Sequence, residues 1–329
     1  MKNRISFFSG MAWLLGWIFL FANSEAAAQS YPNRPITMVV PFSAGGSLDI
    51  LARSYATELS AHLGQPVVVE NKAGAGGSLG ASFVAHAPRD GYTLLFGSIS
   101  TQVINPILKI SMPYNAEQDL IAISRLNDGP LVLVVPAIAS ITTLQALIAQ
   151  SKSNPRGLTF ASAGVGSISH LGGELFKAET GANLTHVPYK GGSAALGDLY
   201  ANTVDMMIET VPNALSGIKT GRLRPIAISG TKRSSVLQQV PTFEELGMQG
   251  MTINAWTGLF APSRVPAAVV TRLVEASQAI AKSKPYQNRI KSFSYEVAAG
   301  NSPSEFSDYI SKESTRWKSV ARHAGIEPE

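Results

Sequence analysis

Short β-branched apolar runs alternate with helical stretches along almost the whole chain, and this alternation most constrains its fold. Ile36–Val40 favours a strand, and Ser47–Leu63 carries apolar residues at helical spacing. Further strands are predicted at Val67–Glu70, Thr93–Phe96, Leu131–Val135, Leu158–Ala161, Leu184–Val187, Val204–Ile208 and Pro225–Ser229, and further helices at Ser78–His86, Leu144–Lys152, Ser167–Glu179, Ala194–Ala201, Ala267–Lys282 and Ser304–His323. This order indicates an α/β protein with mostly parallel sheets flanked by helices.

Two extended, weakly helical stretches interrupt the alternation, at Asp119–Leu126 and Met251–Phe260. Chains of about 300 residues usually divide into two lobes, because a single core stops growing at that size. We therefore interpret the two stretches as crossings between lobes. The predicted first lobe is discontinuous, residues 29–126 plus 252–329, and the second lobe is residues 127–251.

The first residues have the pattern of a secretory leader. Lys2 and Arg4 precede an apolar run from Met11 to Ala22, and small residues follow at Ala26–Ala28. The run is shorter than the roughly 20 residues that span a bilayer. We expect a signal peptide over residues 1–28, cleaved after Ala28, and a mature protein in the periplasm.

Composition excludes several classes of function. The chain has no cysteine, so disulfides, thiolate metal sites and cysteine nucleophiles are excluded. Cleavage removes two basic residues and one acidic residue and lowers the formal net charge from +5 to +4, a balance compatible with an anionic ligand. No basic run is interleaved with aromatics, so nucleic acid is not an expected partner. No cofactor and no metal site are predicted.

Four turns that follow predicted strands combine glycine with a small hydroxyl residue. They are Ser43-Ala44-Gly45-Gly46-Ser47, Gly97-Ser98, Ala163-Gly164-Val165-Gly166-Ser167 and Tyr189-Lys190-Gly191-Gly192-Ser193. Ligands of open α/β sheets bind beyond the carboxyl ends of the strands. Glycine admits close backbone approach, and the N–H groups of a helix start attract an anion. Ser47 and Ser167 suit helix N-caps or hydroxyl donors. Each turn alone is also compatible with an ordinary strand–helix connection, but the set favours a carboxylate site.

Four polar residues near these turns have both a functional and a structural interpretation. His170, in a first helical turn, suits a ligand donor or a core-edge histidine, and Lys190 suits an anion contact or a solvated loop. Asp49 favours its own helix dipole and can brace its loop. Asp205, near a strand, suits an amine contact.

Two enzyme classes match the sequence poorly. No Walker A motif is present, and the glycines after Gly74-Ala75-Gly76 and Gly164-Val165-Gly166 miss the dinucleotide spacing. Gly76-Gly77-Ser78-Leu79-Gly80 matches G-x-S-x-G, with His170, His186 and His323 downstream and Asp198 or Asp205 to complete a triad. The predicted strand ends near Glu70, however, which leaves a long loop where a nucleophile elbow turns sharply. A secreted serine hydrolase using Ser78 therefore remains only an alternative, and we expect a protein that is not an enzyme.

Seven segments, taken in order, resemble one family. They are Pro41–Asp49, Asn71–Gly77, Ala87–Leu94, Ser162–Leu171, His186–Gly192, Val240–Phe243 and Trp256–Pro262. The chain resembles the substrate-binding proteins of tripartite tricarboxylate transporters through essentially its whole mature length. The resemblance implies a two-lobed periplasmic binding fold (type II-like, a Venus flytrap) with its ligand cleft between the lobes. It also implies delivery of a di- or tricarboxylate, aromatic acid or acidic amino acid to a large and a small integral membrane subunit. We expect a monomer.

The resemblance also implies which residues bind. Phe42, Ala44, Gly45, Gly46, Ser47, Gly97 and Ser98 would form one side of the cleft, and Ser162, Gly164, Gly166, Ser167, His170, Tyr189, Lys190 and Gly191 the other, with Asp205 at the family's strand-end aspartate. Glu209 stands where the family leads us to expect an aspartate or a neutral residue. If Glu209 faces the cleft, we expect a ligand that is less acidic or carries an amine. The identity of the carboxylate stays open, as does the alternative of a sensing receptor without a transporter.

Overall fold

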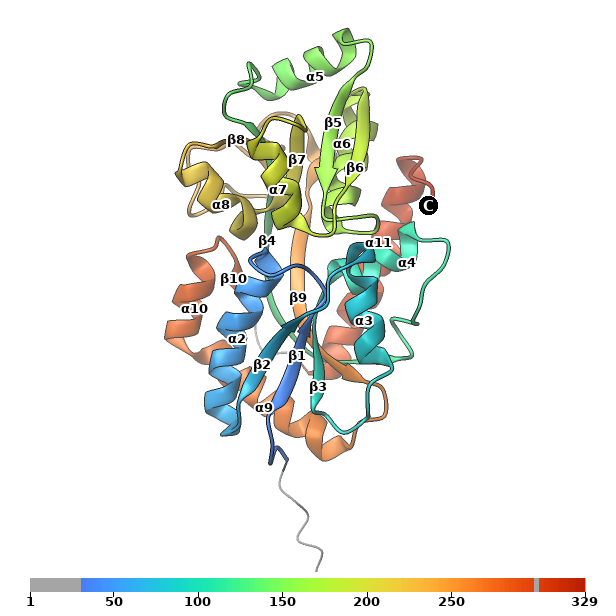
Figure 1. The fold of residues 1–329 in the computed structure, drawn as a ribbon, viewed down its shortest axis with the longest axis vertical. Helices are drawn as coiled ribbons and strands as arrows, with labels where there is room; N and C mark the ends of the chain where they lie inside the picture. The colour runs from blue at the N-terminus through green and yellow to red at the C-terminus, as the bar shows by residue number, and fades with distance from the viewer. Residues whose placement is uncertain (1–30, 299–301, 329) are drawn as a thin grey trace, which may run out of the picture.

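The computed structural model describes residues 31–298 and 302–328, which form two lobes stacked along the long axis of the molecule (Figure 1). The predicted leader and its cleavage site lie outside the described residues. We call the half of the molecule with β1–β3 the lower lobe and the half with β5–β8 the upper lobe. No helix in the described ranges is long and apolar enough to cross a membrane.

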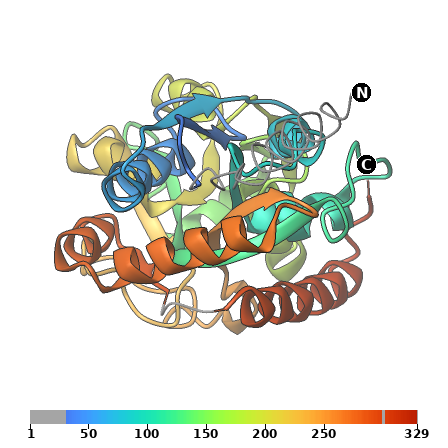
Figure 2. The same ribbon diagram turned by 90° about the horizontal axis from the view of Figure 1, so that it is seen from below.

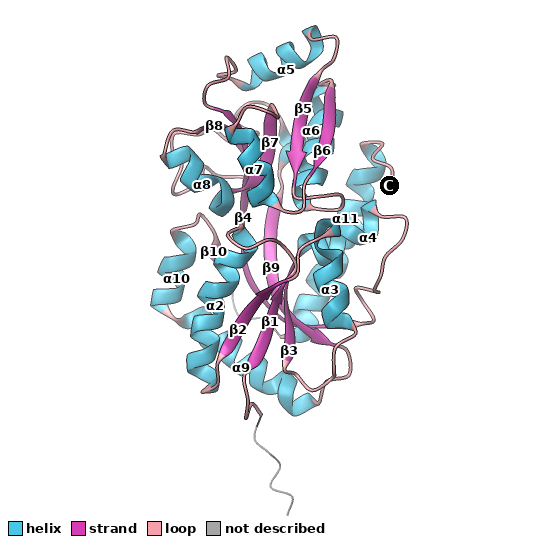
Figure 3. Ribbon diagram, viewed as in Figure 1, coloured by secondary structure: helices cyan, strands magenta, loops and turns pink. Residues whose placement is uncertain are grey.

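The lower lobe is built on three parallel strands. These are β1 (Ile36–Val40), β2 (Val67–Asn71) and β3 (Thr93–Ser98), with β1 between the other two. Around them are α2 (Ser47–Leu63), η1 (Ala75–Gly77), α3 (Ser78–Ala85), η2 (Ser100–Ile104), α4 (Asn105–Leu108), α9 (Ala267–Lys282), α10 (Lys284–Lys291) and α11 (Pro303–His323). In Figure 3, α2 and α10 flank the strands on one side and α3 and α11 on the other. From below, α9 and α11 run along one edge of the molecule (Figure 2).

Two long strands join the lobes. β4 (Leu120–Pro136) pairs antiparallel with β9 (Asn254–Pro262) through its first part, up to Pro130 opposite Asn254. From Leu131 onward β4 pairs instead with strands of the upper lobe. The predicted crossing at Asp119–Leu126 and the predicted strand at Leu131–Val135 are therefore parts of one strand. Antiparallel β10 (Glu296–Val297) adds to β4 in the lower lobe.

The upper lobe repeats the strand–helix arrangement. Its strands are β5 (Leu158–Ser162), β6 (Leu184–Pro188), β7 (Met206–Thr210) and β8 (Leu223–Ile228), and its helices are α5 (Leu144–Ser153), α6 (Ile168–Thr180), α7 (Gly192–Tyr200), α8 (Val211–Lys219) and η3 (Gln249–Met251). β5 pairs parallel with β6 and β7, whereas β7 and β8 pair antiparallel with β4. The strands that lead into helices are thus parallel, as predicted, and the crossing strands make the whole sheet mixed.

Helix α2 shows how local sequence places the elements. Leu51, Ala52, Tyr55 and Leu59 recur at helical spacing and are fully buried on one face. The helix ends at Gly64, which takes the left-handed conformation (φ 69°) and donates its N–H to the Ser60 carbonyl. The buried Tyr55 hydroxyl lies 2.6 Å from Ser277 Oγ of α9, which joins the two helices.

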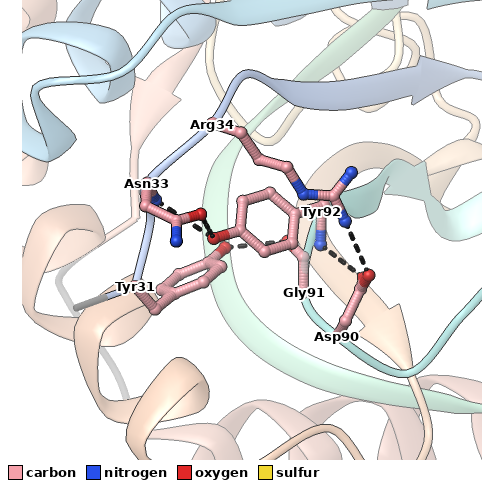
Figure 4. Close-up of polar contacts among 6 residues, drawn as sticks. All are labelled: Tyr31, Asn33, Arg34, Asp90, Gly91 and Tyr92. Atoms are coloured by element: carbon pink, nitrogen blue, oxygen red, sulfur yellow. Dashed lines mark hydrogen bonds and ion pairs between the residues drawn. The ribbon is translucent and has the colours of Figure 1, made fainter. Parts of the chain in front are cut away.

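The first described residues are held to the loop before β3 by a cluster of polar and ring contacts (Figure 4). The Tyr31 hydroxyl donates to the Gly91 carbonyl (2.8 Å), and the Tyr92 hydroxyl donates to Asn33 Oδ1 (2.8 Å) and accepts from its N–H (3.1 Å). The rings of Tyr31 and Tyr92 meet edge to face with centroids 5.2 Å apart. This cluster fixes the chain where it enters β1.

We predict that the double variant Tyr31→Phe, Tyr92→Phe lowers the free energy of unfolding by about 1–2 kcal/mol, since each lost hydrogen bond contributes about 0.5–1.5 kcal/mol. Urea denaturation of the mature chain measures this. Tyr200→Phe is the control, because the Tyr200 ring packs on the Arg222 guanidinium and the substitution keeps the ring. Equal stability of the double variant and the wild type would contradict the role of the cluster.

Candidate functional site

A cavity of about 40 Å³ lies between the lobes at the carboxyl ends of their parallel strands. At about 10–15 Å³ each, roughly three waters fit inside it. The lower-lobe lining is Phe42, Ser43, Gly46, Ser47, Leu48, Ser98, Ile99, Ser100, Ala255, Trp256, Thr257 and Tyr295, and the upper-lobe lining is Ala163, Ser167, Ile168, Ser169, Gly192, Glu209, Thr210 and Asn213. Both lobes therefore contribute to one site.

The start of α2 forms one end of this cavity. Gly46 is the N-cap and makes no side-chain capping bond, so Ser47 and Leu48, which line the cavity, are the first helical residues. The first N–H groups of a helix have no partner within the helix, and the helix dipole is positive there. Ser47 therefore does not cap the helix, and the uncapped start of α2 is a place for an anion.

Asp49 braces the loop that leads into α2, as predicted. Its carboxylate accepts from the Gly45 N–H (3.0 Å), from Asn71 Nδ2 (3.0 Å) and from the Arg53 guanidinium. Burial raises the pKa of Asp49, but the bonds from Arg53, Gly45 and Asn71 outweigh burial and hold this pKa below its usual value. The ionised Asp49 therefore fixes the shape of the loop without lining the cavity.

The turn after β5 is held by its own side chains. The Gly164 N–H donates to Ser162 Oγ (3.1 Å), and the Gly166 N–H donates to His170 Nδ1 (3.4 Å). Ser167 caps α6 by accepting from the His170 N–H (3.2 Å). These backbone N–H groups are thus engaged inside the turn, whereas those at the start of α2 have no such side-chain cap.

The stacked imidazoles of His170 and His186 contact residues of this turn. The rings of His170 and His186 lie 4.0 Å apart between centroids, and His186 also stacks on Phe160 at 4.8 Å. His186 Nε2 lies 2.6 Å from Ser162 Oγ. Burial lowers the pKa of His170 to about 3, helped by His186 and Lys177, and lowers the pKa of His186 to about 4, helped by Lys177. Both rings are therefore neutral at pH 7.

Glycines let the lobes and the cavity wall approach closely. A Cβ on Gly191 would lie 2.2 Å from Ser43 Oγ of the opposite lobe, and one on Gly192 would lie 2.5 Å from Glu209 Oε2. Across the same junction the Ile168 N–H donates to Ser100 Oγ (3.0 Å). The lobes are in contact around the cavity, and a larger residue at position 191 would separate them.

Several buried polar atoms at this junction have no hydrogen-bond partner among the described residues. Those of cavity-lining residues are Ser43 Oγ, Ser98 Oγ, Glu209 Oε2 and Trp256 Nε1. The Trp256 ring is held edge to face by Phe306 and Tyr309 of α11. An unpaired buried polar atom costs about 1–3 kcal/mol. A ligand that supplies partners to these atoms would therefore be stabilised in the cavity.

The structure brings only part of the predicted set to the cavity. Phe42, Gly46, Ser47, Ser98 and Ser167 line it. Ala44, Gly45, Gly97, Ser162, Gly164, Gly166, His170, Tyr189, Lys190 and Gly191 lie in the adjoining loops, strand ends and first helical turn without lining it. Lys190 is exposed, and the Tyr189 hydroxyl donates to Asp198 (2.7 Å).

Asp205 lies at the opposite end of the upper sheet. It immediately precedes β7, and its carboxylate accepts from the N–H (2.7 Å) and hydroxyl (2.8 Å) of Thr159, near the start of β5. The cavity adjoins the other ends of these strands, at Ala163 and Thr210. Asp205 therefore connects the start of β5 to the start of β7 through these hydrogen bonds.

Sequence reasoning missed most of the apolar and upper-lobe lining. Thr210 is the N-cap of α8, and Asn213 follows Pro212 in the first turn of this helix, which was not predicted. Proline is well tolerated in a first helical turn, which was the available clue. Trp256 was noted within a predicted crossing and a family-like segment but not as a site residue, and Tyr295 follows α10, which was not predicted.

Ser78 has a local structural role. It begins α3, and its hydroxyl donates to the Ala75 carbonyl (2.8 Å) and accepts from Lys109 Nζ (3.0 Å). Strand β2 ends at Asn71, so no sharp strand-to-helix elbow places Ser78.

The two neutral imidazoles predict a pH-dependent stability. In the unfolded chain histidine takes up a proton near pH 6.5, whereas folded His186 stays neutral until about pH 4. Stability is therefore complete above pH 6.5 and is lost as the pH falls from 6.5 towards 4. We expect the decrease in Tm between pH 7 and pH 5 to be smaller in His186→Gln, which cannot titrate. Equal decreases in variant and wild type would exclude this contribution.

Comparison with known proteins identifies similar chains. A model described as "Tripartite tricarboxylate transporter family receptor" matches residues 51–326. Protein BugT of Bordetella pertussis (strain Tohama I) is 38% identical over 305 residues, covering 92% of this chain and 93% of BugT. A UPF0065 protein of Pseudomonas sp. (strain P51) is 37% identical over 312 residues, covering 93% of this chain and 92% of its own length.

Solved structures agree with these sequence matches. The periplasmic binding protein BugD has a TM-score of 0.87 at 33% identity, and R. palustris Rpa4515 with adipate has 0.87 at 34%; each comparison covers 91% of this chain and 100% of the other. MatC from Rhodopseudomonas palustris with bound malate has a TM-score of 0.84 at 32% identity, covering 88% and 99%. The predicted family and binding fold are thus confirmed. The chain belongs to the tripartite tricarboxylate transporter receptor family and is a periplasmic-type solute-binding protein, not an enzyme.

Proposed function

We propose that this protein captures a small carboxylate in the cavity between its lobes and delivers it to a tripartite membrane transporter. One observation carries the proposal: the uncapped start of α2 lines a cavity beside two buried serine hydroxyls, Ser43 and Ser98, that have no partner among the described residues. Backbone N–H groups and hydroxyls at a helix start are suited to an anion.

The strength of such a site is adequate for a receptor. Hydrogen bonds to a charged group contribute about 1.5–3 kcal/mol each, and a micromolar complex requires about 8.2 kcal/mol. Four or five bonds from Ser43, Ser98 and the first residues of α2 would reach this value after the costs of binding. Strong affinity therefore does not require a basic side chain in the cavity.

The ligands of similar proteins support a carboxylate. Rpa4515 is described with adipate and MatC with bound malate, both of which are carboxylates. Their identity to this chain is 34% and 32%, and each comparison extends over most of both chains. We extend the class of ligand to this protein, and not the particular acid.

The remaining parts of the proposal concern export, lobes and partners. We propose that the leader is cleaved after Ala28 and that the mature protein works in the periplasm as a monomer. We place the lobes at residues 29–126 with 252–329 and at residues 127–251, supported by the change of pairing partners along β4 between Pro130 and Leu131. Its partners would be the large and small integral subunits of the transporter.

We predict that one or more members of a carboxylate panel raise the Tm of the mature protein by a few degrees. A ligand at about 100 times its Kd adds about 2.7 kcal/mol of stability. The panel contains mono-, di- and tricarboxylates, aromatic acids and amino acids, and mass spectrometry checks that the ligand is recovered unchanged. A panel with no effect on Tm, or chemical conversion of the ligand, would exclude the proposed function.

The serine hydroxyls can be tested separately with the ligand identified by that screen. We expect Ser43→Ala and Ser98→Ala each to weaken binding by about 1.5–3 kcal/mol, which is roughly tenfold to a hundredfold in Kd. Isothermal titration measures this, and Ser319→Ala, on the exposed face of α11, is the matched control. If both cavity variants bind as the control does, the ligand does not contact these hydroxyls.

A further inference from the structure

The lining of the cavity contains a carboxylate and no basic side chain. Glu209 is its one Asp or Glu, and none of the described residues that line the cavity is Lys, Arg or His. Glu209 is 4% exposed, so its charge is almost completely removed from water. A buried carboxylate is costly unless a donor or a cation pairs with it.

The Glu209 carboxylate is held in a fixed orientation. Oε1 accepts from the N–H of Thr210 (2.6 Å) and from its hydroxyl (2.7 Å). Oε2 is buried and makes no hydrogen bond of normal geometry among the described residues, although the Asn213 side chain lies close enough to lower the pKa of this carboxyl group. Gly192 leaves the space that Oε2 occupies, because a Cβ there would lie 2.5 Å from it. One oxygen is therefore anchored, and the other is left to accept from a ligand.

Burial disfavours the ionised form of Glu209, and hydrogen bonds and the nearby helix start offset this only in part. Burial raises the pKa of Glu209 above its usual value, and the hydrogen bonds from Thr210 and from the side chain of Asn213 oppose this increase without cancelling it. A cation paired with the carboxyl group would favour its ionised form. Glu209 lies two residues before Val211, the first residue of α8. The helix dipole is positive at this end of α8. The aromatic residues Phe42, Trp256 and Tyr295 line the same cavity, and aromatic ring faces attract cations.

The unpartnered atoms of the cavity are therefore of two kinds. Ser43 Oγ, Ser98 Oγ and Trp256 Nε1 can donate to a carboxylate, together with the start of α2. Glu209 Oε2, when ionised, can only accept. A ligand that satisfies both kinds needs a carboxylate and an N–H or ammonium donor in one small molecule.

A second carboxylate on the ligand would fit this cavity poorly. It would bring a like charge next to Glu209, and two close carboxylates cannot both stay ionised. No basic side chain of the lining would compensate this charge. A second carboxylate would therefore have to be paired by hydrogen-bond donors alone, next to Glu209.

We propose that Glu209 makes this receptor selective for a small amino-carboxylate, whose carboxylate lies at the start of α2 and whose ammonium group pairs with Glu209 Oε2. This proposal rests on the proposed carboxylate-binding function and specifies its substrate class. Glu209 is then the specificity-determining residue of the site.

Matched ligand pairs test the proposal by isothermal titration of the mature protein. The pairs are γ-aminobutyrate with succinate, β-alanine with malonate, and L-alanine with L-lactate, which keep similar sizes and exchange the ammonium for a carboxylate or a hydroxyl. We expect the wild type to bind the best amino-carboxylate about tenfold or more tightly than its partner. Glu209→Gln should lose about tenfold or more for that ligand and should bind the dicarboxylate better than the wild type does.

Two further variants make the result interpretable. Glu209→Asp keeps the charge and should keep the preference for the amino-carboxylate at reduced affinity. Glu244→Gln removes one charge from an exposed position outside the cavity and should bind as the wild type does. Melting curves confirm that each variant is folded before titration.

The outcomes separate this inference from the function on which it rests. If dicarboxylates bind more tightly than amino-carboxylates, or if Glu209→Gln leaves the ratio of the two affinities unchanged, Glu209 does not select the ligand while carboxylate binding stands. If neither these pairs nor the wider carboxylate panel binds to the wild type, both proposals fail.

Discussion

The antiparallel pairing of β4 with β9 is the constraint on which the rest of the structure depends. The pairing runs from Leu120 opposite Pro262 to Pro130 opposite Asn254, after which β4 continues into the upper sheet. The parallel strands of both lobes are attached to this pair, and their carboxyl ends meet at the junction of the lobes. The position of the cavity therefore follows from the crossing strands, and its chemistry follows from the loops that end there.

The loops at this junction divide into two types. In the turn after β5, Ser162 and His170 accept from the N–H groups of Gly164 and Gly166. The start of α2 has no side-chain cap, and its loop is instead braced from outside the cavity by Asp49. Glycine contributes mainly space here, since Gly191 allows the close approach of Ser43 and Gly192 that of Glu209. The unpaired N–H groups at an uncapped helix start can bind an anion without a basic side chain.

The sequence predicted the elements well where periodicity was strong. The structure confirms the bounds of α2 and α9 as predicted, because their apolar residues follow helical spacing over several turns. The sequence was less informative for α8, which contains Pro212 and Gly217 and was not predicted. It was also less informative for β4, which was predicted as a separate crossing and strand. Short segments such as these are decided by tertiary pairing, which local propensity does not contain.

The candidate site was predictable as a region and less so as a set of atoms. Glycine and serine turns indicated the junction, yet the sequence could not distinguish N–H groups bonded within a turn from those left open. The family resemblance implied His170 and Ser162 as ligand contacts, and in the structure these side chains accept hydrogen bonds from the N–H groups of Gly166 and Gly164. Asp205 immediately precedes β7, and Glu209 lies near the other end of this strand. Asp205 therefore accepts a hydrogen bond from β5, whereas Glu209 lines the cavity.

The buried polar atoms of the cavity also connect binding with closure. Glu209 Oε2 and the serine hydroxyls are buried in this arrangement, in which the two lobes meet through Ser100 and Ile168. In an open arrangement water would pair with these atoms, so closing the lobes without a partner costs free energy. A ligand can shift the equilibrium towards closure only by its difference in affinity for the two arrangements. A ligand with the proposed carboxylate and donor groups would provide that difference, so the atoms proposed to recognise it would also favour the closed arrangement.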